Sequence, residues 1–436
     1  MDASAYFKGK RITVMGLGLL GRSVGDAEYL ASCGAILTIT DLKTHEELAE
    51  SLARLSPFSS IEYVLGEHRL SDFENKDLIL KSAGVPLESP YIAHAKASGV
   101  PVRMSADLFA EISGVSVVGV TGTRGKSTVT QMIHDMLVAD GRKVLLGGNV
   151  RGVSTLALLK EATPEHVAVL ELDSWQCHGF GEVRMSPHVA VFTTFMDDHL
   201  VYYKNDIDAY LKDKAQIFLH QSKEDVLVLG AQAKPVVLTT YQDQIQSRVV
   251  EPESLPQAYT LFVRGEHNRY NAGIARAVAL SMGVSDDSIA ETLATFKGVP
   301  GRLEFVREVE GVSYYNDTNA TTPEATLAGL RALGENKNIV LIMGGHDKGL
   351  RMGELLEHIP HFTKRVILLA GSGTNSVLTH IAHASVFDSL QGAFEEASRY
   401  ATEGDVVLLS PAFASFGMFK NEYDRGDQFT ALVEKL

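Results

Sequence analysis

A glycine-rich segment that ends in Lys126 and Ser127 has the residue types that point most clearly to chemistry. VVGVTG (117–122) is an apolar, β-branched run, TRGKST (123–128) follows it, and a helical pattern comes next. In a strand–loop–helix of this kind, backbone N–H groups and the helix dipole favour a bound phosphate. The lysine can neutralise the β- and γ-phosphates, and the serine hydroxyl can bind Mg²⁺. The full GxxxxGK[ST] pattern requires glycine at position 120, where the sequence has valine, so this loop is a shorter form.

A second glycine-rich segment, Gly16-Leu-Gly-Leu-Leu-Gly21, matches GxGxxG, and Asp41 lies 20 residues beyond Gly21 at the end of the next predicted strand. This arrangement is typical of dinucleotide binding, in which glycines let the backbone approach phosphates at a helix N-terminus. The residues alone leave three interpretations open. They are an NAD-dependent dehydrogenase, a tight turn that packs a helix on a strand, and a Rossmann-like domain that holds the diphosphate of another nucleotide.

The elements that must position these loops are short apolar runs that alternate with helical patterns, in three series. The predicted strands are 11–16, 36–41, 62–66 and 78–84 in the first series, 115–122, 143–149, 167–173, 189–195 and 225–230 in the second, and 313–318, 338–345, 365–373 and 405–412 in the third. A helical pattern also covers 208–221. We therefore expect three consecutive α/β domains: a Rossmann-like domain at 1–108, a P-loop ATPase-like domain at 109–298 and a Rossmann-like domain at 299–436.

Bulk properties exclude several classes of protein. The chain has 436 residues, a formal net charge of −14 and two cysteines, Cys33 and Cys177. The negative charge argues against non-specific binding to nucleic acid. The sequence contains no apolar run long enough for a membrane-spanning helix and no pattern typical of a signal peptide, so we expect no membrane insertion. Two cysteines cannot build a disulfide framework, which favours the reducing cytoplasm.

The loop TGTRGKST (121–128) resembles the phosphate loop of the Mur ligases and of the related folylpolyglutamate synthases. Other segments similar to the Mur ligases follow in the family's order over nearly the whole chain. They are GLGLLGRS (16–23), SAGVPLESP (82–90), GGN (147–149), LELDSWQ (170–176), DDH (197–199), YLKDKAQIF (210–218), HNRYNA (267–272), GRLE (301–304), NDTNATTPEAT (316–326), GGHDKG (344–349) and LLSPAFASFGMFKN (408–421). The last three resemble the branch that adds D-glutamate.

The resemblance implies an activity: ATP-dependent ligation of D-glutamate to UDP-N-acetylmuramoyl-L-alanine through an acyl phosphate, in cytoplasmic peptidoglycan precursor synthesis. The partners would be these small molecules, with ATP and two Mg²⁺ ions as cofactors. Four alternatives stay open: a Mur-type ligase that adds L-glutamate, a folylpolyglutamate synthase-like enzyme, an NAD-dependent dehydrogenase, and an inactive nucleotide-binding regulator.

The resemblance also implies roles for individual residues. The catalytic residues would be Lys126, Glu171, His199 and Lys214, with Lys214 at the position of the lysine that carries a carbamate in the family. The metal ligands would be Ser127, Glu171 and His199. The ATP-binding residues would be Gly122, Thr123, Gly125, Lys126, Ser127, Thr128, Asn268, Asn271, Arg302 and Asp317. Those that bind the UDP substrate would be Gly18, Leu19, Leu20, Asp41, Ser82, Gly84, Asn149, Ser174 and Gln176. Thr321, Lys348 and Ser415 would bind D-glutamate.

Residue types alone do not distinguish several of these roles from ordinary structural ones. A lysine such as Lys214 on an amphipathic helix is usually solvated, and a carboxylate such as Glu171 at a strand end often only caps a loop. Asn268 and Asn271 could be helix caps. Lys348 and Ser415 could be solvated loop residues.

The sequence also departs from the family pattern at several positions. Where the family has Ser-Ser, this chain has Asp173-Ser174, which places an extra carboxylate beside the expected metals. Where the family has E-D-H-x-D-R, this chain has DDHLVY (197–202), so it lacks an acid and an arginine next to His199. The other departures are Gly301 for histidine, Asn319 for lysine, and Glu422-Tyr423 for Phe-Glu. Because Lys126, Glu171, His199 and Lys214 are all present, we expect an active enzyme.

Overall fold

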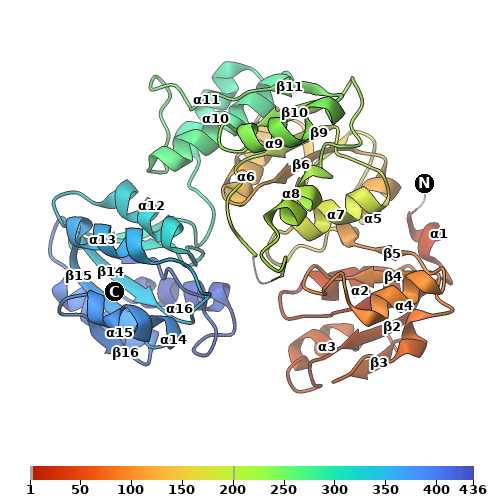
Figure 1. The fold of residues 1–436 in the computed structure, drawn as a ribbon, viewed down its shortest axis with the longest axis horizontal. Helices are drawn as coiled ribbons and strands as arrows, with labels where there is room; N and C mark the ends of the chain where they lie inside the picture. The colour runs from red at the N-terminus through yellow and green to blue at the C-terminus, as the bar shows by residue number, and fades with distance from the viewer. Residues whose placement is uncertain (1–2, 200–201) are drawn as a thin grey trace. The chain divides into compact units, whose positions relative to one another are not determined.

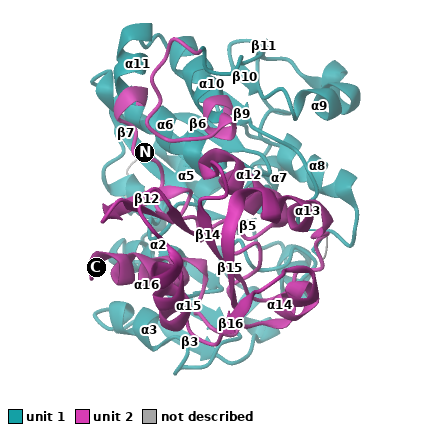
Figure 2. Cartoon of the chain, turned by 90° about the vertical axis from the view of Figure 1, so that its left-hand side faces the viewer, with its two compact units in different colours: residues 1–256, 271–292 teal, residues 257–270, 293–436 magenta. Residues whose placement is uncertain are grey.

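The structure is a computed structural model that describes residues 3–199 and 202–436. Leu200 and Val201 of the DDHLVY segment therefore lie outside the described residues. The chain divides into two compact units (Figures 1 and 2). Unit 1 comprises Met1–Pro256 and Asn271–Thr292, and unit 2 comprises Gln257–Tyr270 and Leu293–Leu436. The described residues form three sheets, and the predicted class of three consecutive α/β domains is confirmed.

The first sheet is parallel and lies in unit 1, with the strand order β3-β2-β1-β4-β5. Its strands are β1 (Arg11–Met15), β2 (Ile36–Asp41), β3 (Glu62–Leu65), β4 (Leu78–Lys81) and β5 (Val102–Arg103). The helices of this segment are α1 (Ala3–Phe7), α2 (Arg22–Ser32), α3 (Ala49–Leu55), η1 (Leu70–Phe73), α4 (Pro90–Ala97) and α5 (Ser105–Ser113). The order changes direction at β1, so the glycine-rich loop after β1 lies at the point where a doubly wound sheet binds ligands.

The second sheet, also in unit 1, is parallel with the order β11-β10-β9-β6-β8-β7. Its strands are β6 (Ser116–Thr121), β7 (Lys143–Gly148), β8 (His166–Glu171), β9 (Val189–Phe192), β10 (Val226–Leu229) and β11 (Arg248–Val250). The helices from this part of the chain are α6 (Lys126–Ala139), η2 (Leu156–Lys160), α7 (Ser174–Glu182), α8 (Ile207–Ala215), α9 (Lys234–Tyr241), η3 (Gln242–Gln244), α10 (Glu266–Ser281) and α11 (Asp286–Thr295). Strands β9 and β10 are apolar and buried along their whole length because helices cover both faces of a parallel sheet.

The third sheet lies in unit 2, with the order β12-β13-β17-β14-β15-β16. Its strands are β12 (Glu304–Val309), β13 (Val312–Asn316), β14 (Ile339–Gly344), β15 (Thr363–Leu369), β16 (Ser385–Phe387) and β17 (Val406–Leu409). Its helices are α12 (Pro323–Leu333), α13 (Gly353–Phe362), α14 (Ser372–Val377), η4 (Leu378–His380), α15 (Leu390–Tyr400) and α16 (Glu422–Glu434).

The structure differs from the predicted elements in several edge strands and in one helix. Strands β5, β11 and β16 were not predicted, because each is only two or three residues long. Strand β12 pairs antiparallel with β13 and was not predicted, because EFVREV alternates charged and apolar residues on a largely exposed edge. The helix expected over 208–221 is shorter, since α8 ends at Ala215. Beyond that point the N–H groups of Ile217 and Phe218 bond to carbonyls three residues back, and these tighter turns still bury both side chains. Among the described residues, no helix has the length and apolar composition needed to cross a membrane.

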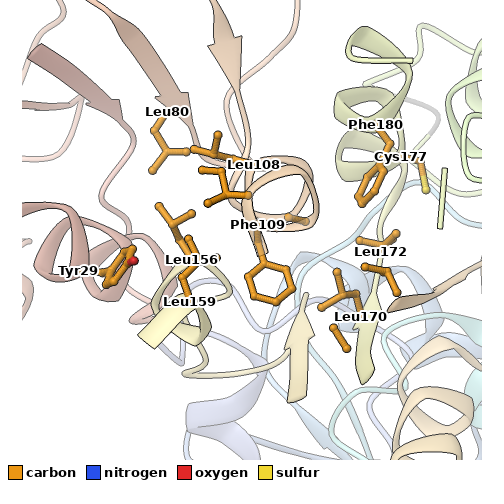
Figure 3. Close-up of a cluster of buried hydrophobic side chains, with 14 of the residues drawn as sticks. Tyr29, Leu80, Leu108, Phe109, Leu156, Leu159, Leu170, Leu172, Cys177 and Phe180 are labelled. Carbon is orange, nitrogen blue, oxygen red and sulfur yellow. The ribbon is translucent and has the colours of Figure 1, made fainter. Parts of the chain in front are cut away.

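One apolar core continues from the first sheet to the second within unit 1 (Figure 3). It includes Leu80 of β4, Phe109 of α5, Leu156 of η2 and Leu170 of β8, all buried. Phe109 is completely buried and lies in the part of the cluster that joins the two sheets. Packing at Phe109 therefore holds the first glycine-rich loop in a defined position relative to the second.

A buried carboxylate adds polar bonds to the same junction. Asp26 of α2 accepts hydrogen bonds from the hydroxyl of Ser105 in α5, from the hydroxyl of Ser154 at 2.6 Å and from the N–H of Leu156 at 3.3 Å. Burial raises the pKa of Asp26, while these donors and the charge of Arg22 lower it. A buried carboxylate of this kind is tolerated because its oxygens have partners from both sides of the junction.

Removing the ring of Phe109 tests whether this junction stabilises unit 1. We expect Phe109→Ala to lower the free energy of unfolding by about 3–5 kcal/mol, because it removes a fully buried aromatic side chain and leaves a cavity. Phe109→Leu, the matched control, retains most of the volume and should cost less than about 2 kcal/mol. Urea denaturation can follow unit 1 through Trp175, the only tryptophan of the chain. Equal losses in the two variants would contradict the prediction.

Candidate active site

The loop between β6 and α6 has a backbone that only glycine permits at two positions. Gly122 has a φ of 139°, and a Cβ there would lie 2.0 Å from Oγ1 of Thr193. Gly125 has a φ of 86°, and a Cβ there would lie 2.5 Å from Oδ1 of Asn271. The loop thus packs closely on the end of β9 and beside Asn271. Its next residue, Lys126, opens α6, so the helix N-terminus faces the loop as phosphate binding requires.

A half-buried lysine and a buried lysine converge on one carbonyl oxygen of this loop. The Lys126 ammonium donates to the carbonyl oxygens of Gly122 at 3.0 Å and Thr123 at 3.2 Å. The Lys214 ammonium donates to the same Gly122 oxygen at 2.8 Å and to Oγ1 of Thr121 at 3.3 Å. Burial lowers the pKa of both lysines, and repulsion from Lys214 lowers that of Lys126 further. An anion bound at the loop would relieve this repulsion.

Helix α8 places Lys214 at the loop. Its first turn is capped by Asp206, whose carboxylate accepts the N–H of Ala209 at 2.9 Å. Tyr210, one turn before Lys214, stacks on Phe195 with ring centroids 5.5 Å apart, and the Lys214 ammonium lies 4.8 Å from the Tyr210 ring. Lys214 is only 1% exposed, so the alternative of a solvated helix residue is wrong.

Glu171 ends β8 and is buried, at 4% exposure. Its main-chain oxygen accepts the N–H of Asn149 at 2.7 Å, and a Cβ on Gly148 would lie 2.0 Å from that oxygen. The Glu171 charge raises the pKa of Lys126 against the lowering by burial, so the carboxylate acts on the phosphate loop.

Asp173, one of the departures from the family pattern, is the N-cap residue that precedes α7. Its carboxylate accepts the N–H of Gln176 at 2.8 Å, and the Gln176 side-chain oxygen accepts the N–H of Asp173 at 3.1 Å. This is a capping box, so the extra carboxylate has a structural use at a helix N-terminus. Ser174 and Gln176, expected to bind the UDP substrate, lie buried in the same first turn.

His199 lies beside the loop on the segment that follows β9. Its ring packs edge-on against Trp175, with centroids 4.9 Å apart. The side chain is 41% exposed, and the partial loss of water on its packed side lowers its pKa. Asp198 accepts the His199 N–H at 2.9 Å through one oxygen and a guanidinium N–H of Arg124 at 2.9 Å through the other. The pairing of Arg124 with Asp198 was missed from the sequence, because the two residues lie 74 positions apart.

The residues expected to bind magnesium do not make a complete metal site. Among the described residues, no group of three or more His, Cys, Asp or Glu side chains is arranged to hold a metal ion. The donors available at the loop are the Glu171 carboxylate, the Ser127 hydroxyl and the His199 imidazole. This set fits Mg²⁺, which usually takes one or two carboxylates and completes its shell with waters and substrate phosphates.

The first glycine-rich loop is held differently. The Asp41 carboxylate accepts the N–H groups of Leu17 at 2.8 Å, Gly18 at 3.0 Å and Lys43 at 2.9 Å, and the side chain is buried. Both carboxylate oxygens of Asp41 are therefore already hydrogen-bonded to main-chain N–H groups. This bonding weakens the dehydrogenase interpretation, in which this carboxylate binds a ribose hydroxyl. Leu19 is exposed, so the tip of the loop is accessible.

The segment after β4 packs against the start of that loop. A Cβ on Gly16 would lie 2.4 Å from Oγ of Ser82. Lys81, buried at the end of β4, donates to the carbonyl oxygens of Ser82 at 3.0 Å and Val85 at 2.9 Å and so fixes the turn that contains Gly84. Burial lowers the pKa of Lys81 to about 8.

Asn149, from the second sheet, also reaches the first glycine-rich loop. Its side-chain oxygen accepts a guanidinium N–H of Arg22, the first residue of α2. Three of the residues expected to bind the UDP substrate, Gly18, Ser82 and Asn149, thus belong to one connected part of unit 1. The role of Arg22 in this connection was missed from the sequence, because GxGxxG sets no residue type after its last glycine.

In unit 2, the Asp317 carboxylate accepts the N–H of Leu303 at 2.9 Å and the Ser410 hydroxyl at 2.8 Å. Burial raises the pKa of Asp317 to about 7, although these bonds and the charge of Arg302 oppose the shift. Asn268 donates to the carbonyl oxygen of Arg264 at 2.8 Å.

Two of the residues expected to bind D-glutamate meet in unit 2. The Lys348 ammonium lies 3.4 Å from Oγ1 and 3.5 Å from the main-chain oxygen of Thr321. Ser415 is buried, and its main-chain oxygen accepts the N–H of Phe419 at 3.3 Å.

A completely buried arginine ties the loops around Thr321 and Ser415 together. Arg425 of α16 donates to Oγ1 of Thr318 at 3.0 Å and to the main-chain oxygens of Thr318 at 2.8 Å and Phe413 at 3.4 Å. Burial lowers its pKa to about 10. The sequence contained no signal for this role, because an arginine in the first turns of a helix is usually solvated.

A chain of ion pairs next to Lys214 joins α4, α7 and α8. Asp213 accepts the hydroxyl of Tyr203 at 2.9 Å and pairs with Nδ1 of His178 at 2.9 Å. The other His178 nitrogen lies 3.2 Å from Glu182, which pairs with Lys96 at 2.9 Å. Burial opposes a charged His178, but its bonds to Asp213 and Glu182 prevail and raise its pKa to about 9. The same histidine bond lowers the pKa of Glu182 to about 2.

The stability of unit 1 should follow the protonation of His178. Its folded-state pKa of about 9 lies above the value of about 6.5 expected in the unfolded chain. The stabilisation is therefore complete below about pH 6.5 and is lost as the pH rises through about 9. Urea midpoints from pH 6 to 10 should fall more steeply for the parent than for His178→Gln. Parallel curves for the two proteins would refute this assignment.

Comparisons with known proteins place three family models along the chain. The Mur ligase MurD-like N-terminal domain matches residues 10–104, the Mur ligase middle domain matches 120–250, and the Mur ligase glutamate ligase domain matches 301–413. The chain is 37% identical to the UDP-N-acetylmuramoylalanine--D-glutamate ligase of Roseiflexus sp. (strain RS-1) over 464 residues, which covers 98% of each chain.

Solved structures share the fold at lower identity. The UDP-N-acetylmuramate-alanine ligase MurC of Thermotoga maritima matches with a TM-score of 0.65 and 20% identity, covering 98% of this chain and 99% of that one. The MurF ligase of Thermotoga maritima in complex with ADP matches with a TM-score of 0.60 and 17% identity, covering 91% and 94%.

Proposed function

The chain belongs to the Mur ligase family, and on that premise we propose that it joins D-glutamate to UDP-N-acetylmuramoyl-L-alanine with conversion of ATP to ADP and phosphate. The observation that carries the proposal is the match over 98% of the chain to a relative named for that ligation. The phosphate loop supports it, because Lys126 and the N-terminus of α6 form a site for a phosphate or acyl phosphate. The full-length match does not favour the folylpolyglutamate synthase or dehydrogenase alternatives.

The proposed reaction has two steps. A carboxylate oxygen of the alanyl substrate attacks the γ-phosphorus of ATP, and the bond to the β–γ bridging oxygen breaks with its electron pair, which releases ADP. The amine nitrogen of D-glutamate then attacks the carbonyl carbon of the acyl phosphate. The bond from that carbon to the phosphate oxygen breaks, phosphate leaves, and the nitrogen loses a proton. Both steps develop negative charge on phosphate oxygens, so fixed donors and cations at the loop lower the barrier.

The residues of the phosphate loop supply these donors in our proposal. Gly122, Thr123, Gly125 and Thr128 shape a backbone cradle, and Lys126 neutralises the phosphates. Asn271, packed against Gly125, and Asn268 would lie on the adenine side. Arg302 and Asp317 would contact ATP, with the planar arginine donors suited to phosphate and the carboxylate to ribose hydroxyls.

The donors at Ser127, Glu171 and His199 would hold two Mg²⁺ ions together with substrate oxygens. When bound, magnesium neutralises the charge that develops on the phosphate oxygens. Glu171 contributes a carboxylate fixed at a strand end, and the capped helix α7 keeps Asp173 directed at its own backbone.

The two other substrates would use the remaining residues. The UDP group would occupy the first glycine-rich loop, with Gly18, Leu19 and Leu20 at its tip, Asp41 beneath it, Ser82 and Gly84 on the adjoining turn, and Asn149, Ser174 and Gln176 from the second sheet. Lys348, Thr321 and Ser415 would bind the carboxylates of D-glutamate, which need several donors. We assign these functions to domains at 1–108, 109–298 and 299–436. A cytoplasmic location fits the UDP-linked substrate and the buried free thiols of Cys33 and Cys177.

One coupled assay tests the proposed function. Purified protein with ATP, Mg²⁺ and UDP-N-acetylmuramoyl-L-alanine should release phosphate with D-glutamate, and far less with L-glutamate, L-alanine or diaminopimelate. Lys126→Ala should lower the rate by at least about 100-fold, because it removes a fixed cation from the phosphate. No phosphate release with any of the amino acids would contradict the proposal, and a preference for another amino acid would correct the substrate.

A second test concerns a carbamate on Lys214. A neutral lysine nitrogen can attack the carbon of CO₂, form an N–C bond and release one proton, and the lowered pKa of Lys214 favours the neutral amine. We expect Lys214→Arg, which keeps the charge but cannot form this carbamate, to lower turnover by about 100-fold. In ¹³C-bicarbonate, the parent should show a protein-bound carbamate carbon by NMR that the variant lacks. Parental turnover in Lys214→Arg would argue against a carbamate.

A further inference from the structure

Arg124 lies within the phosphate loop and has a firmly held backbone. Its N–H donates to Oγ1 of Thr194 at 2.8 Å, and its carbonyl oxygen accepts the hydroxyls of Thr193 at 2.6 Å and Thr194 at 3.1 Å. Both threonines directly follow β9. The base of the side chain is therefore fixed between Gly122 and Lys126, and only the guanidinium is able to change partners.

In this structure the guanidinium donates to Asp198 at 2.9 Å and to the main-chain oxygen of Thr123 at 3.2 Å. The side chains of Arg124 and Asp198 are 32% and 16% exposed, so solvent screens their ion pair. A solvent-screened ion pair contributes little, whereas arginine–phosphate contacts are charge-assisted and often bidentate. A phosphoryl group at the loop would therefore compete successfully for this arginine.

The Arg124 charge already acts on the two lysines that bond to Gly122. It lowers the pKa of Lys126 and of Lys214, although burial has the larger effect on both. Asp198, its partner, directly precedes His199. The guanidinium thus links the phosphate loop, where Lys126 and Lys214 bond to Gly122, to the segment that contains Asp198. That segment departs from the family pattern and has Tyr202 in place of an arginine.

We propose that Arg124 is a further catalytic residue that exchanges Asp198 for the phosphoryl group in transfer. The inference rests on the proposed function. As the bond from the γ-phosphorus to the bridging oxygen breaks and the carboxylate oxygen bonds to phosphorus, Arg124 donates hydrogen bonds to the non-bridging oxygens. It gains and loses no proton. An arginine on the loop itself thereby supplies the planar cation that the segment at 197–202 lacks.

Transition-state binding tests the inference without any amino-acid substrate. ADP with Mg²⁺ and aluminium fluoride mimics the phosphoryl group in flight, while ADP with Mg²⁺ alone does not. Arg124→Ala should weaken binding of the aluminium fluoride complex by about 100-fold and change binding of ADP far less. Arg124→Lys should recover part of the loss, because it restores charge without the planar pair of donors. Arg248→Ala, which removes an exposed arginine on β11, is the matched control and should behave as the parent.

Measurements of turnover and a double variant of Arg124 and Asp198 distinguish a catalytic role of Arg124 from a structural one. Arg124→Ala should lower kcat by about 100-fold with little change in the melting temperature. If the arginine only held Asp198, Asp198→Asn would reproduce the loss and the double variant would be no worse than either single variant. That pattern, or equal loss of ADP and aluminium fluoride binding, would overturn the inference. A parent that binds the complex through Arg124 yet releases no phosphate would count against the proposed substrates alone.

Discussion

The main-chain oxygen of Gly122 accepts hydrogen bonds from two ammonium groups, those of half-buried Lys126 and buried Lys214, and the arrangement of the candidate active site depends on that convergence. It requires the positive φ of Gly122, since a side chain there would collide with Thr193. It also requires α8 to pack Tyr210 and Lys214 against the loop. Two adjacent cations with little contact to water repel each other, so this geometry favours the binding of a phosphate.

An acidic chain therefore creates a local site for anions through burial and placement rather than through net charge. The whole sequence carries a formal charge of −14, yet Lys126, Lys214 and Arg124 all act on one loop. Glu171 and Asp198 supply the opposite charge at its edge. The hydrogen bond from Tyr203 to Asp213 and the ion pairs that continue through His178 and Glu182 to Lys96 join the helices that support Lys214.

The two glycine-rich loops of unit 1 differ in what fills the space around them. At the first, the Asp41 carboxylate accepts backbone N–H groups of the loop and holds its shape. At the second, lysines and a helix N-terminus face the loop, and no carboxylate is bonded to its glycines in the part of the chain described. The shared core around Phe109 and the bonds of Asp26 join the two loops into one unit.

The sequence by itself determined the alternation of strands and helices, the two glycine-rich loops and, through its resemblance to a family, a set of candidate residues. Local patterns suffice there because strands buried on both faces are continuously apolar and glycine is required where φ is positive. Only the tertiary structure decided that Lys214 is buried rather than solvated, that Asp173 caps a helix and that Asp41 bonds to its own loop. It also decided that Arg425 holds the loop at Thr318 and that Arg124 pairs with Asp198 beside the phosphate loop. Asp173 bonds to Gln176, only three residues away, but each of the others depends on a partner far away in the chain. A side chain's burial and long-range bonding are properties of the packed fold rather than of its neighbours in sequence.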